Sequence, residues 1–438
     1  MADLLTPQLI TSIIVILVVI HVILLGCAYL IMLERKLSAW IQDRVGPNRV
    51  GPLGLLQPIA DGLKFILKEE FFPAGADRWL FLLAPCLVII PALIGFAVIP
   101  WGGSLDLSSL PFGLADALNV SGERVQVIAA NVNIGLIYLV AVASLGIYGV
   151  VLGGWASNSK YSFLGALRAS AQMISYEIPM GLAILAMILL AGTVMPSEMV
   201  AKQLGGESGG AWYLLHHPIA AVLFYTCMLA ENNRAPFDLA EAESELVGGY
   251  HTEYSSMKFA LFFLAEYSHM ITGSAFFVVL FLGGWSLNPL PWGPDLPYEG
   301  GLLLILLQFG IVLFKIFLVI SLTMAIRWTL PRFRFDQLMR LAWEGMIPAA
   351  LLVVLVTSFV VFMGWQESMW VASLAMMIFI WAVKPLLPKQ AHPNRRLAMI
   401  GSRFSPLRDE SVITGPTDPI ALSESAVPEH SMGTISMH

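Results

Sequence analysis

Long apolar stretches recur along the sequence, and they constrain the fold more than any other feature. Of the 438 residues, 57% are hydrophobic and only 12% are charged, with a mean hydropathy of +0.77. A water-soluble domain carries about twice that share of charge. Each stretch is long enough to cross about 30 Å of hydrocarbon as a helix. The chain is therefore predicted to be an all-α, polytopic integral membrane protein.

About nine transmembrane helices are predicted from these stretches. They are expected near residues 9–33, 79–100, 126–152, 164–192, 212–230, 258–284, 301–327, 345–365 and 369–387. Lys and Arg concentrate in every second connecting loop and after the last stretch, whereas the opposite loops carry only Arg124 and Lys202. Because cytoplasmic loops carry the excess of positive charge, the N-terminus is expected outside and the C-terminus in the cytoplasm.

Polar loops and a polar tail are expected on the cytoplasmic side. The loops comprise residues 34–78, 231–257 and 328–344. Within the first loop, apolar and polar residues alternate at helical spacing over residues 55–68, which predicts an amphipathic helix in the membrane interface. From about residue 390 the sequence is rich in Ser, Pro and Thr. Residues 1–389 are therefore expected to form the membrane domain, and 390–438 a disordered tail.

Acidic residues cluster in the loop between the fifth and sixth expected helices. They are Glu231, Asp238, Glu241, Glu243, Glu245 and Glu253. A carboxylate near hydrocarbon is unfavourable unless it is paired, hydrated or protonated, so the cluster indicates ion passage, a proton relay or a ligand site. A solvated acidic loop is the alternative. Glu177, beside Pro179 in the fourth expected helix, is expected to exchange a proton, with a pure packing role as its alternative.

The sequence lacks the patterns of a protein that binds metal, nucleotide or nucleic acid. Cys27, Cys86 and Cys227 stand singly in apolar surroundings, and the eight histidines form no metal-binding spacing. No Gly-rich phosphate loop follows a strand, and no Gly-x-Ser-x-Gly elbow occurs. Glu266 and Lys315, within later apolar stretches, are weaker candidates for function.

Several linked motifs together resemble one family. They are Glu-Arg-Lys (34–36), Gln-Asp-Arg-Val-Gly-Pro-Asn-Arg-Val-Gly-Pro (42–52), Gly-Leu-Leu-Gln-Pro-Ile-Ala-Asp-Gly-Leu-Lys (54–64), Ile-Ser-Tyr-Glu (174–177), the acidic run 231–253, and Pro-Arg-Phe-Arg-Phe-Asp-Gln-Leu-Met (331–339). Their order over roughly residues 10–365 is similar to the H subunit of bacterial NADH–quinone oxidoreductase, the counterpart of a mitochondrial complex I subunit. The ninth helix and the tail depart from the mitochondrial form, and the ninth helix resembles longer bacterial versions.

This resemblance implies a role inside a large complex of the cell inner membrane. The family's subunit joins the hydrophilic arm to the membrane arm and contributes the lipid-side half of the ubiquinone chamber. FMN and Fe–S clusters would belong to partner subunits, so this chain would bind no cofactor, hold no catalytic residue and have no activity alone. The implied partners are the hydrogenase-like large subunit, the terminal Fe–S cluster subunit, and small and antiporter-like membrane subunits, together with quinone and the lipid bilayer.

The resemblance also implies roles for individual residues. Those implied to line the quinone passage or hold its loops are Glu34, Arg35, Arg44, Asp61, Arg234, Phe237, Arg327 and Arg332, with Phe259 and Phe263 as apolar wall. Those implied to begin a carboxylate chain for proton coupling are Glu177, Glu231, Glu241, Glu243, Glu245 and Glu253. The membrane subunit of an energy-converting hydrogenase or formate hydrogenlyase-type complex is the nearest alternative, and a stand-alone cation transporter is a more distant one. The Arg-Val-Gly-Pro-Asn and Ala-Pro-Phe-Asp-Leu segments favour the quinone-linked complex.

Overall fold

The computed structural model describes most of the chain. The described residues are 6–109, 122–204, 210–240, 247–290, 292 and 295–383. Met1–Ile380 form one compact unit, and Trp381–His438 form a second, of which residues 381–383 are described. The predicted tail, 390–438, therefore lies outside the described residues.

Within the described residues, seven helices are long and apolar enough to cross a membrane. They are α1 (Pro7–Ile41), α3 (Arg78–Ile94, extended by a 3-10 turn to Val98), α5 (Gly135–Ala156), α6 (Lys160–Ala191), α11 (Ser256–Phe281), α12 (Leu302–Thr329), and α13 (Phe335–Arg340), which continues through a π-turn into α14 (Ile347–Phe362). Two shorter apolar helices, α9 (Pro218–Glu231) and α15 (Met369–Val383), occupy the other expected positions. The all-α membrane fold is confirmed, and nine crossings remain a prediction.

Two of the expected helices differ from the observed ones for local reasons. The fifth is broken at His217 into α8 (Tyr213–His216) and α9, because Pro218 has no backbone N–H and a residue before proline avoids the helical region. The third begins at Gly135 rather than 126, since Gln126 belongs to a strand and its backbone bonds the Gln8 side chain.

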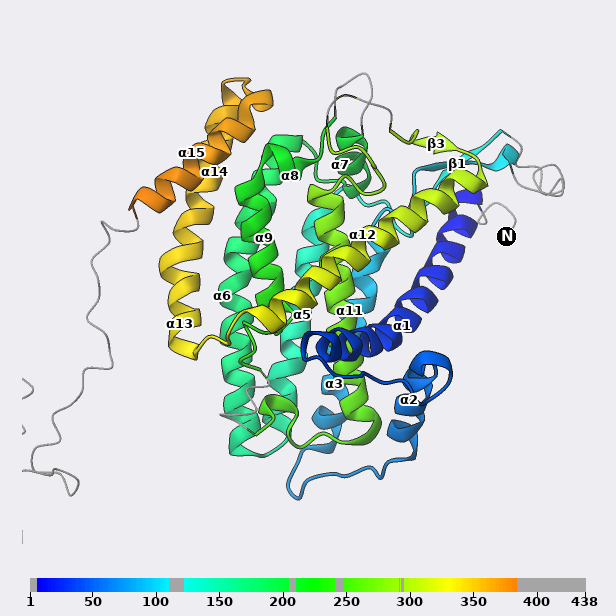
Figure 1. Ribbon diagram of the computed structural model, residues 1–438, viewed down its shortest axis with the longest axis vertical. Coiled ribbons are helices and arrows are strands. Elements are labelled where there is room, and N and C mark those ends of the chain that lie inside the picture. The colour runs from blue at the N-terminus through cyan, green and yellow to red at the C-terminus, as the bar shows by residue number, and fades with distance from the viewer. Residues whose placement is uncertain are drawn as a thin grey trace, which may run out of the picture. The chain divides into compact units, whose positions relative to one another are not determined.

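The long helices pack into a bundle. Helix α6 packs against α5, α9 and α14, and α11 packs against α1, α3 and α12. Figure 1 shows α6, α9 and α11 running roughly parallel, with α12 crossing them obliquely. Gly149 lets α5 approach α3 closely, because a Cβ there would lie 2.3 Å from Val88 Cγ2. Tyr176, Phe224 and Phe281 fill the core of the bundle.

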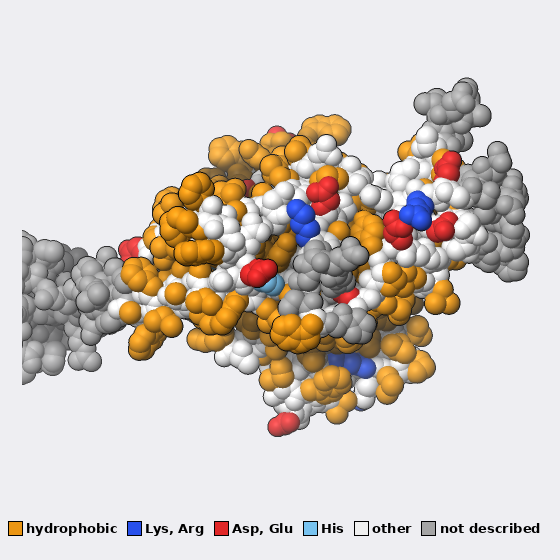
Figure 2. Space-filling view, turned by 90° about the horizontal axis from the view of Figure 1, so that it is seen from above, with side chains coloured by type: hydrophobic (Ala, Val, Ile, Leu, Met, Phe, Trp, Pro, Cys, Tyr) orange, Lys and Arg blue, Asp and Glu red, His pale blue; other side chains and the backbone are white. Residues whose placement is uncertain are grey.

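A small sheet lies at one end of the bundle. Strands β1 (Ser104–Asp106), β2 (Arg124–Gln126) and β3 (Glu299–Gly300) pair in the order β2-β1-β3, with β1 and β2 antiparallel and β1 and β3 parallel. Helix α7 (Pro196–Gln203) lies at the same end in Figure 1. Figure 2 views this end, where hydrophobic side chains cover much of the rim and charged side chains lie mainly on the end face.

A short amphipathic helix, α2 (Gln57–Leu67), lies at the opposite end (Figure 1). It occupies the segment in which the sequence predicts an interfacial helix. None of its residues is buried, and Ile59, Leu63 and Ile66 are 65%, 53% and 64% exposed. Since these apolar side chains do not join the protein core, their exposure fits a helix whose apolar face enters the lipid interface.

Candidate functional site

Four charged side chains from separate segments meet in a buried cluster, here called the Glu34 cluster. It contains Glu34 of α1, Arg234 of the loop after α9, Glu266 of α11 and Arg327 of α12. The guanidinium of Arg327 bonds Glu34 Oε1, and Arg234 Nη1 lies 3.5 Å from the same oxygen. Arg234 Nε lies 2.9 Å from Glu266 Oε1. Glu34 and Arg234 are only 9% and 5% exposed and the Arg327 side chain is 25% exposed, so two carboxylates and two guanidinium groups balance each other with little access to water.

Tyr267 completes the cluster. Its hydroxyl donates to Glu34 Oε2 at 2.6 Å, and the guanidinium of Arg234 lies 4.6 Å from the centre of its ring. Both oxygens of Glu34 therefore have partners. A buried charge set of this kind holds the four segments in one arrangement, because removing one member leaves another charge uncompensated.

The loop after α9 is fixed against α6 and the segment after α12. Gln172 Nε2 donates to the carbonyl oxygens of Ala230 and Phe237, each at 2.7 Å. Arg332 Nη2 lies 2.8 Å from Asp238 Oδ2. The ring of Phe237 packs 5.4 Å from that of Tyr176. The described part of this loop is thus ordered and largely buried, which contradicts the solvated-loop alternative there; Glu241, Glu243 and Glu245 lie outside the described residues.

An apolar pocket of about 390 Å³ lies between α1, α2 and α11, here called the α2 pocket. Its lining includes Arg35, Asp61, Phe65, Phe259 and Phe263. Arg35 Nη1 binds Asp61 Oδ2 at 2.7 Å, which ties α1 to α2, and the rings of Phe259 and Phe263 lie 4.7 Å apart. Ile31 and Phe263 line this pocket, and one helical turn further along the same helices lie Glu34 on α1 and Tyr267 on α11, so the pocket adjoins the buried cluster.

Glu177 and Glu231 line one small cavity. Its volume is about 10 Å³, and Ser144, Tyr176 and Cys227 also line it. The Ser144 hydroxyl donates to Glu177 Oε1. A cavity of this size holds about one water molecule. Tyr176, which packs on Phe237, connects this cavity to the loop that carries Arg234.

Two predicted site residues do not join these groups within the described part of the chain. Arg44 is exposed, and its Nε donates to Gln42 Oε1 at 2.7 Å. Glu253 forms no ion pair with any described residue and lies before α11. Beside it, Tyr254 donates to the carbonyl of Phe81 at 3.2 Å and stacks on its ring. Burial raises the pKa of the Tyr254 phenol, so the group stays a neutral donor.

Sequence reasoning missed two residues of this region, Tyr267 and Gln172, and gave too little weight to a third, Glu266. Glu266 appeared only as a weaker candidate, although a lone carboxylate in an apolar helix was a usable signal. Tyr267 and Gln172 carry no such signal, because Tyr and Gln occur in many helices without a special role. Among the described residues, no group of three or more His, Cys, Asp or Glu side chains could hold a metal ion.

Together these features define a polytopic membrane protein with a charge-balanced buried cluster and, beside it, an apolar pocket between α1, α2 and α11. The profile of a family described as NADH dehydrogenase matches residues 14–358. One H subunit of the NADH-quinone oxidoreductase of Geobacter sulfurreducens is 47% identical over 349 residues, 79% of this chain and 93% of the relative. An H subunit of the Cytophaga hutchinsonii oxidoreductase is 46% identical over 326 residues (74% and 89%), and that of Leptospira biflexa is 45% identical over 349 (79% and 93%). The chain therefore belongs to this family, as a membrane subunit of NADH–quinone oxidoreductase, or complex I.

Proposed function

We propose that the chain forms part of the quinone chamber of NADH–quinone oxidoreductase and couples quinone reduction to proton translocation. The observation that carries this proposal is the adjacency of the α2 pocket to the Glu34 cluster. An apolar passage that ends at a few placed polar groups is what a ligand with a long apolar tail and a polar ring requires.

The α2 pocket suits the isoprenoid tail of a quinone. Phe65, Phe259 and Phe263 give it aromatic walls, and the exposed apolar side chains of α2 place it at the lipid interface. The Arg35–Asp61 pair lies at its rim and provides polar contacts for a ring that passes. Phe237, Arg327 and Arg332 would hold the surrounding loops, and Arg44 would act from the exposed loop after α1.

The Glu34 cluster would transmit the charge change of quinone reduction. A quinone takes up electrons and protons when it is reduced, and charges in a low-dielectric site interact strongly. Neighbouring carboxylates titrate as coupled groups, so a change at the chamber can alter protonation elsewhere. The Phe237–Tyr176 contact supports a route from the loop of Arg234 to the Glu177–Glu231 cavity. Glu241, Glu243, Glu245 and Glu253 would extend this carboxylate chain.

The remaining assignments follow from the family and from the charge asymmetry of the loops. The complex would lie in the inner membrane of the cell. The N-terminus of this chain would lie outside that membrane and the C-terminus in the cytoplasm. Partner subunits would hold FMN and the Fe–S clusters and would include the hydrogenase-like large, terminal Fe–S, small and antiporter-like membrane subunits. The chain would have no activity alone.

Filling the α2 pocket tests this function. Ala260 lines the pocket, so Ala260→Trp should raise KM for a long-tailed quinone and lower kcat/KM in the assembled complex. Oxidation of NADH by a soluble electron acceptor should be unchanged, because it does not use the pocket. Leu303→Trp is the matched control, since Leu303 is 82% exposed at the start of α12. Normal quinone kinetics in an assembled Ala260→Trp complex would contradict the proposal.

A further inference from the structure

A second apolar pocket lies between α1, α11 and α12, here called the α12 groove. Its volume is about 360 Å³, and its lining includes Gly26, Tyr29, Lys36, Trp101, Ile271 and Phe317. Residues 22, 23, 26, 29, 30, 33 and 36 of α1 line only the groove, residues 27, 28, 31 and 35 line only the α2 pocket, and Met32 lies between the two sets and lines both. At about 100° per residue these two sets occupy opposite faces of α1. The groove is therefore distinct from the proposed quinone pocket, and α1 forms the wall between them.

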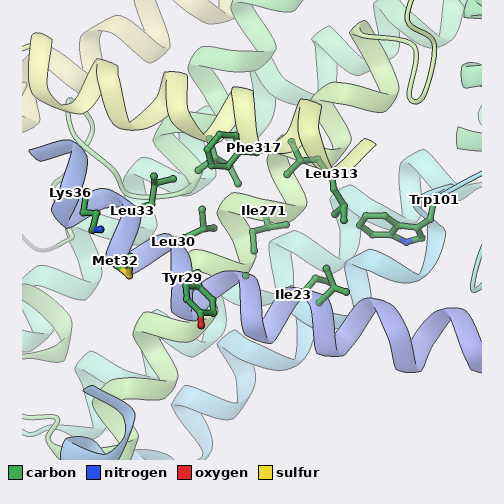
Figure 3. Close-up of a pocket in the computed structure, with 14 residues that line it drawn as sticks. Ile23, Tyr29, Leu30, Met32, Leu33, Lys36, Trp101, Ile271, Leu313 and Phe317 are labelled. Carbon is green, nitrogen blue, oxygen red and sulfur yellow. The ribbon is translucent and has the colours of Figure 1, made fainter. Parts of the chain in front are cut away.

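The α12 groove is apolar along its length and carries a cation at one end. Figure 3 shows Lys36 and Trp101 at opposite ends, with Leu30, Ile271 and Leu313 between them. Lys36 lies near the end of α1 that leads to the basic loop with Arg44 and Arg49. The two ends of the groove thus differ in polarity. Lys36 places a positive charge at one end, and the buried indole of Trp101 closes the other end.

The ammonium of Lys36 has hydrogen-bond donors available for an anion. It donates to the carbonyl of Leu53 at 2.6 Å, and it forms no ion pair with any described residue. An ammonium has three donors, so others remain for a ligand. Tyr29 lies seven residues earlier, two turns or about 10 Å along the same face of α1. A charged group, then a hydroxyl, then an apolar groove is the order met on passing from a phosphate through ester groups to an acyl chain.

We propose that the α12 groove binds an anionic phospholipid of the surrounding bilayer. Its phosphate would bind Lys36, and one acyl chain would lie between α1 and α12 toward Trp101. The distance along α1 from Lys36 to residue 22 is about 21 Å. This length is comparable to one leaflet of a bilayer about 40–45 Å thick, headgroups included, although α1 and α12 run obliquely to the other long helices, so the acyl chain would lie obliquely as well. A lipid held there would support the face of α1 that lies behind the quinone pocket.

A quinone is the rival occupant, and charge favours the phospholipid. The indole N–H of Trp101 is buried without a hydrogen-bond partner in the described structure, so it could donate to a quinone carbonyl. A neutral quinone, however, gains little from an interfacial ammonium, whereas a phosphate gains a charge-assisted hydrogen bond.

Lipid retention by the purified complex tests the proposal. The complex is washed in detergent, titrated with dioleoylphosphatidylglycerol or dioleoylphosphatidylcholine, and its bound lipid is measured by native mass spectrometry. Lys36→Gln should weaken phosphatidylglycerol binding at one site about fivefold, and phosphatidylcholine binding less, because the choline group offsets the charge of its phosphate. Gly26→Leu should remove that site for both lipids, and a Cβ there fits the fold because its nearest atom, Ile271 Cδ1, is 3.7 Å away.

Matched controls separate the groove from general effects of charge and bulk. Lys160→Gln removes an exposed lysine at the start of α6, and Gly310→Leu adds bulk where a Cβ meets no atom within 4 Å. Both controls should retain the wild-type lipid count. Unchanged phosphatidylglycerol binding in Lys36→Gln would overturn the proposal, whether or not Gly26→Leu assembles. So would loss of co-purified quinone, with phosphatidylglycerol retained, in Gly26→Leu.

Discussion

Removing the guanidinium of Arg234 should disable quinone reduction while the donor side of the complex continues to work. Arg234 is 5% exposed and faces Glu34 at 3.5 Å and Glu266 at 2.9 Å. Arg327 still neutralises Glu34 in Arg234→Ala, so the loss falls mainly on Glu266. Removing one partner of a buried pair costs about 3–5 kcal/mol. If that energy is lost from the active arrangement, quinone reductase activity should fall by about 100-fold or more.

Arg234→Lys should fall between the wild type and Arg234→Ala. Lysine keeps the charge, but its compact ammonium does not reproduce a planar fork that faces two carboxylates. The assay compares NADH:quinone activity with NADH oxidation by a soluble acceptor in complexes of equal subunit content. Only the first activity should fall. Arg340→Ala is the control, because its pair with Glu344 is 3.8 Å long and both side chains are about half exposed.

A double substitution makes the physical reasoning refutable. Glu266→Gln removes the charge that Arg234→Ala leaves uncompensated, so the double variant should be more stable and more active than Arg234→Ala alone. The coupling energy between the two positions should be about 1–3 kcal/mol. Near-normal quinone activity in Arg234→Ala, or additive losses in the double variant, would show that this ion pair does not organise the site.

Three further outcomes are expected. Glu177→Gln should preserve assembly and lower the number of protons pumped per NADH in proteoliposomes, because the amide can still accept from Ser144 but cannot titrate; unchanged pumping would leave Glu177 a packing residue. Lys315→Met should lower the free energy of unfolding by about 2 kcal/mol, since Lys315 Nζ donates to the carbonyls of Leu282 and Ser286 after α11. An unchanged melting temperature of the complex would contradict this. Deletion of residues 390–438 should leave NADH:quinone activity within about tenfold of normal, because a polar segment without apolar periodicity has no core to join; a larger loss with assembly intact would reveal a role for the tail.

The features predicted well from the sequence are those set by local composition. Hydropathy located the apolar helices, and the alternating residues at 55–68 located α2 (Gln57–Leu67). Local chemistry also explains where the observed helices differ from the expected ones. Pro218 breaks the fifth expected helix, and Gln126 belongs to a strand instead of the third expected helix. These errors come from backbone and side-chain hydrogen bonding that average hydropathy does not contain.

The Glu34 cluster was beyond local reasoning. Glu34 and Arg327 are 293 positions apart, and which helices become neighbours depends on packing across the whole bundle. Arg234 lies between Glu231 and Asp238 in an acidic loop, whereas its described carboxylate partners belong to α1 and α11. The Gln172 bonds that fix the loop were likewise invisible, because an isolated Gln in a helix predicts no particular partner.

Photoaffinity labelling with a quinone tests the central claim most directly. An analogue with a photoreactive group on its isoprenoid tail is bound to the native complex, activated, and mapped by mass spectrometry. The α2 pocket predicts labelling of Phe65 and of the segment from Met257 to Phe263, which excess native quinone should suppress. Labelling confined to other subunits, or to the α12 groove around Leu313 and Phe317, would contradict the assignment of the α2 pocket to quinone.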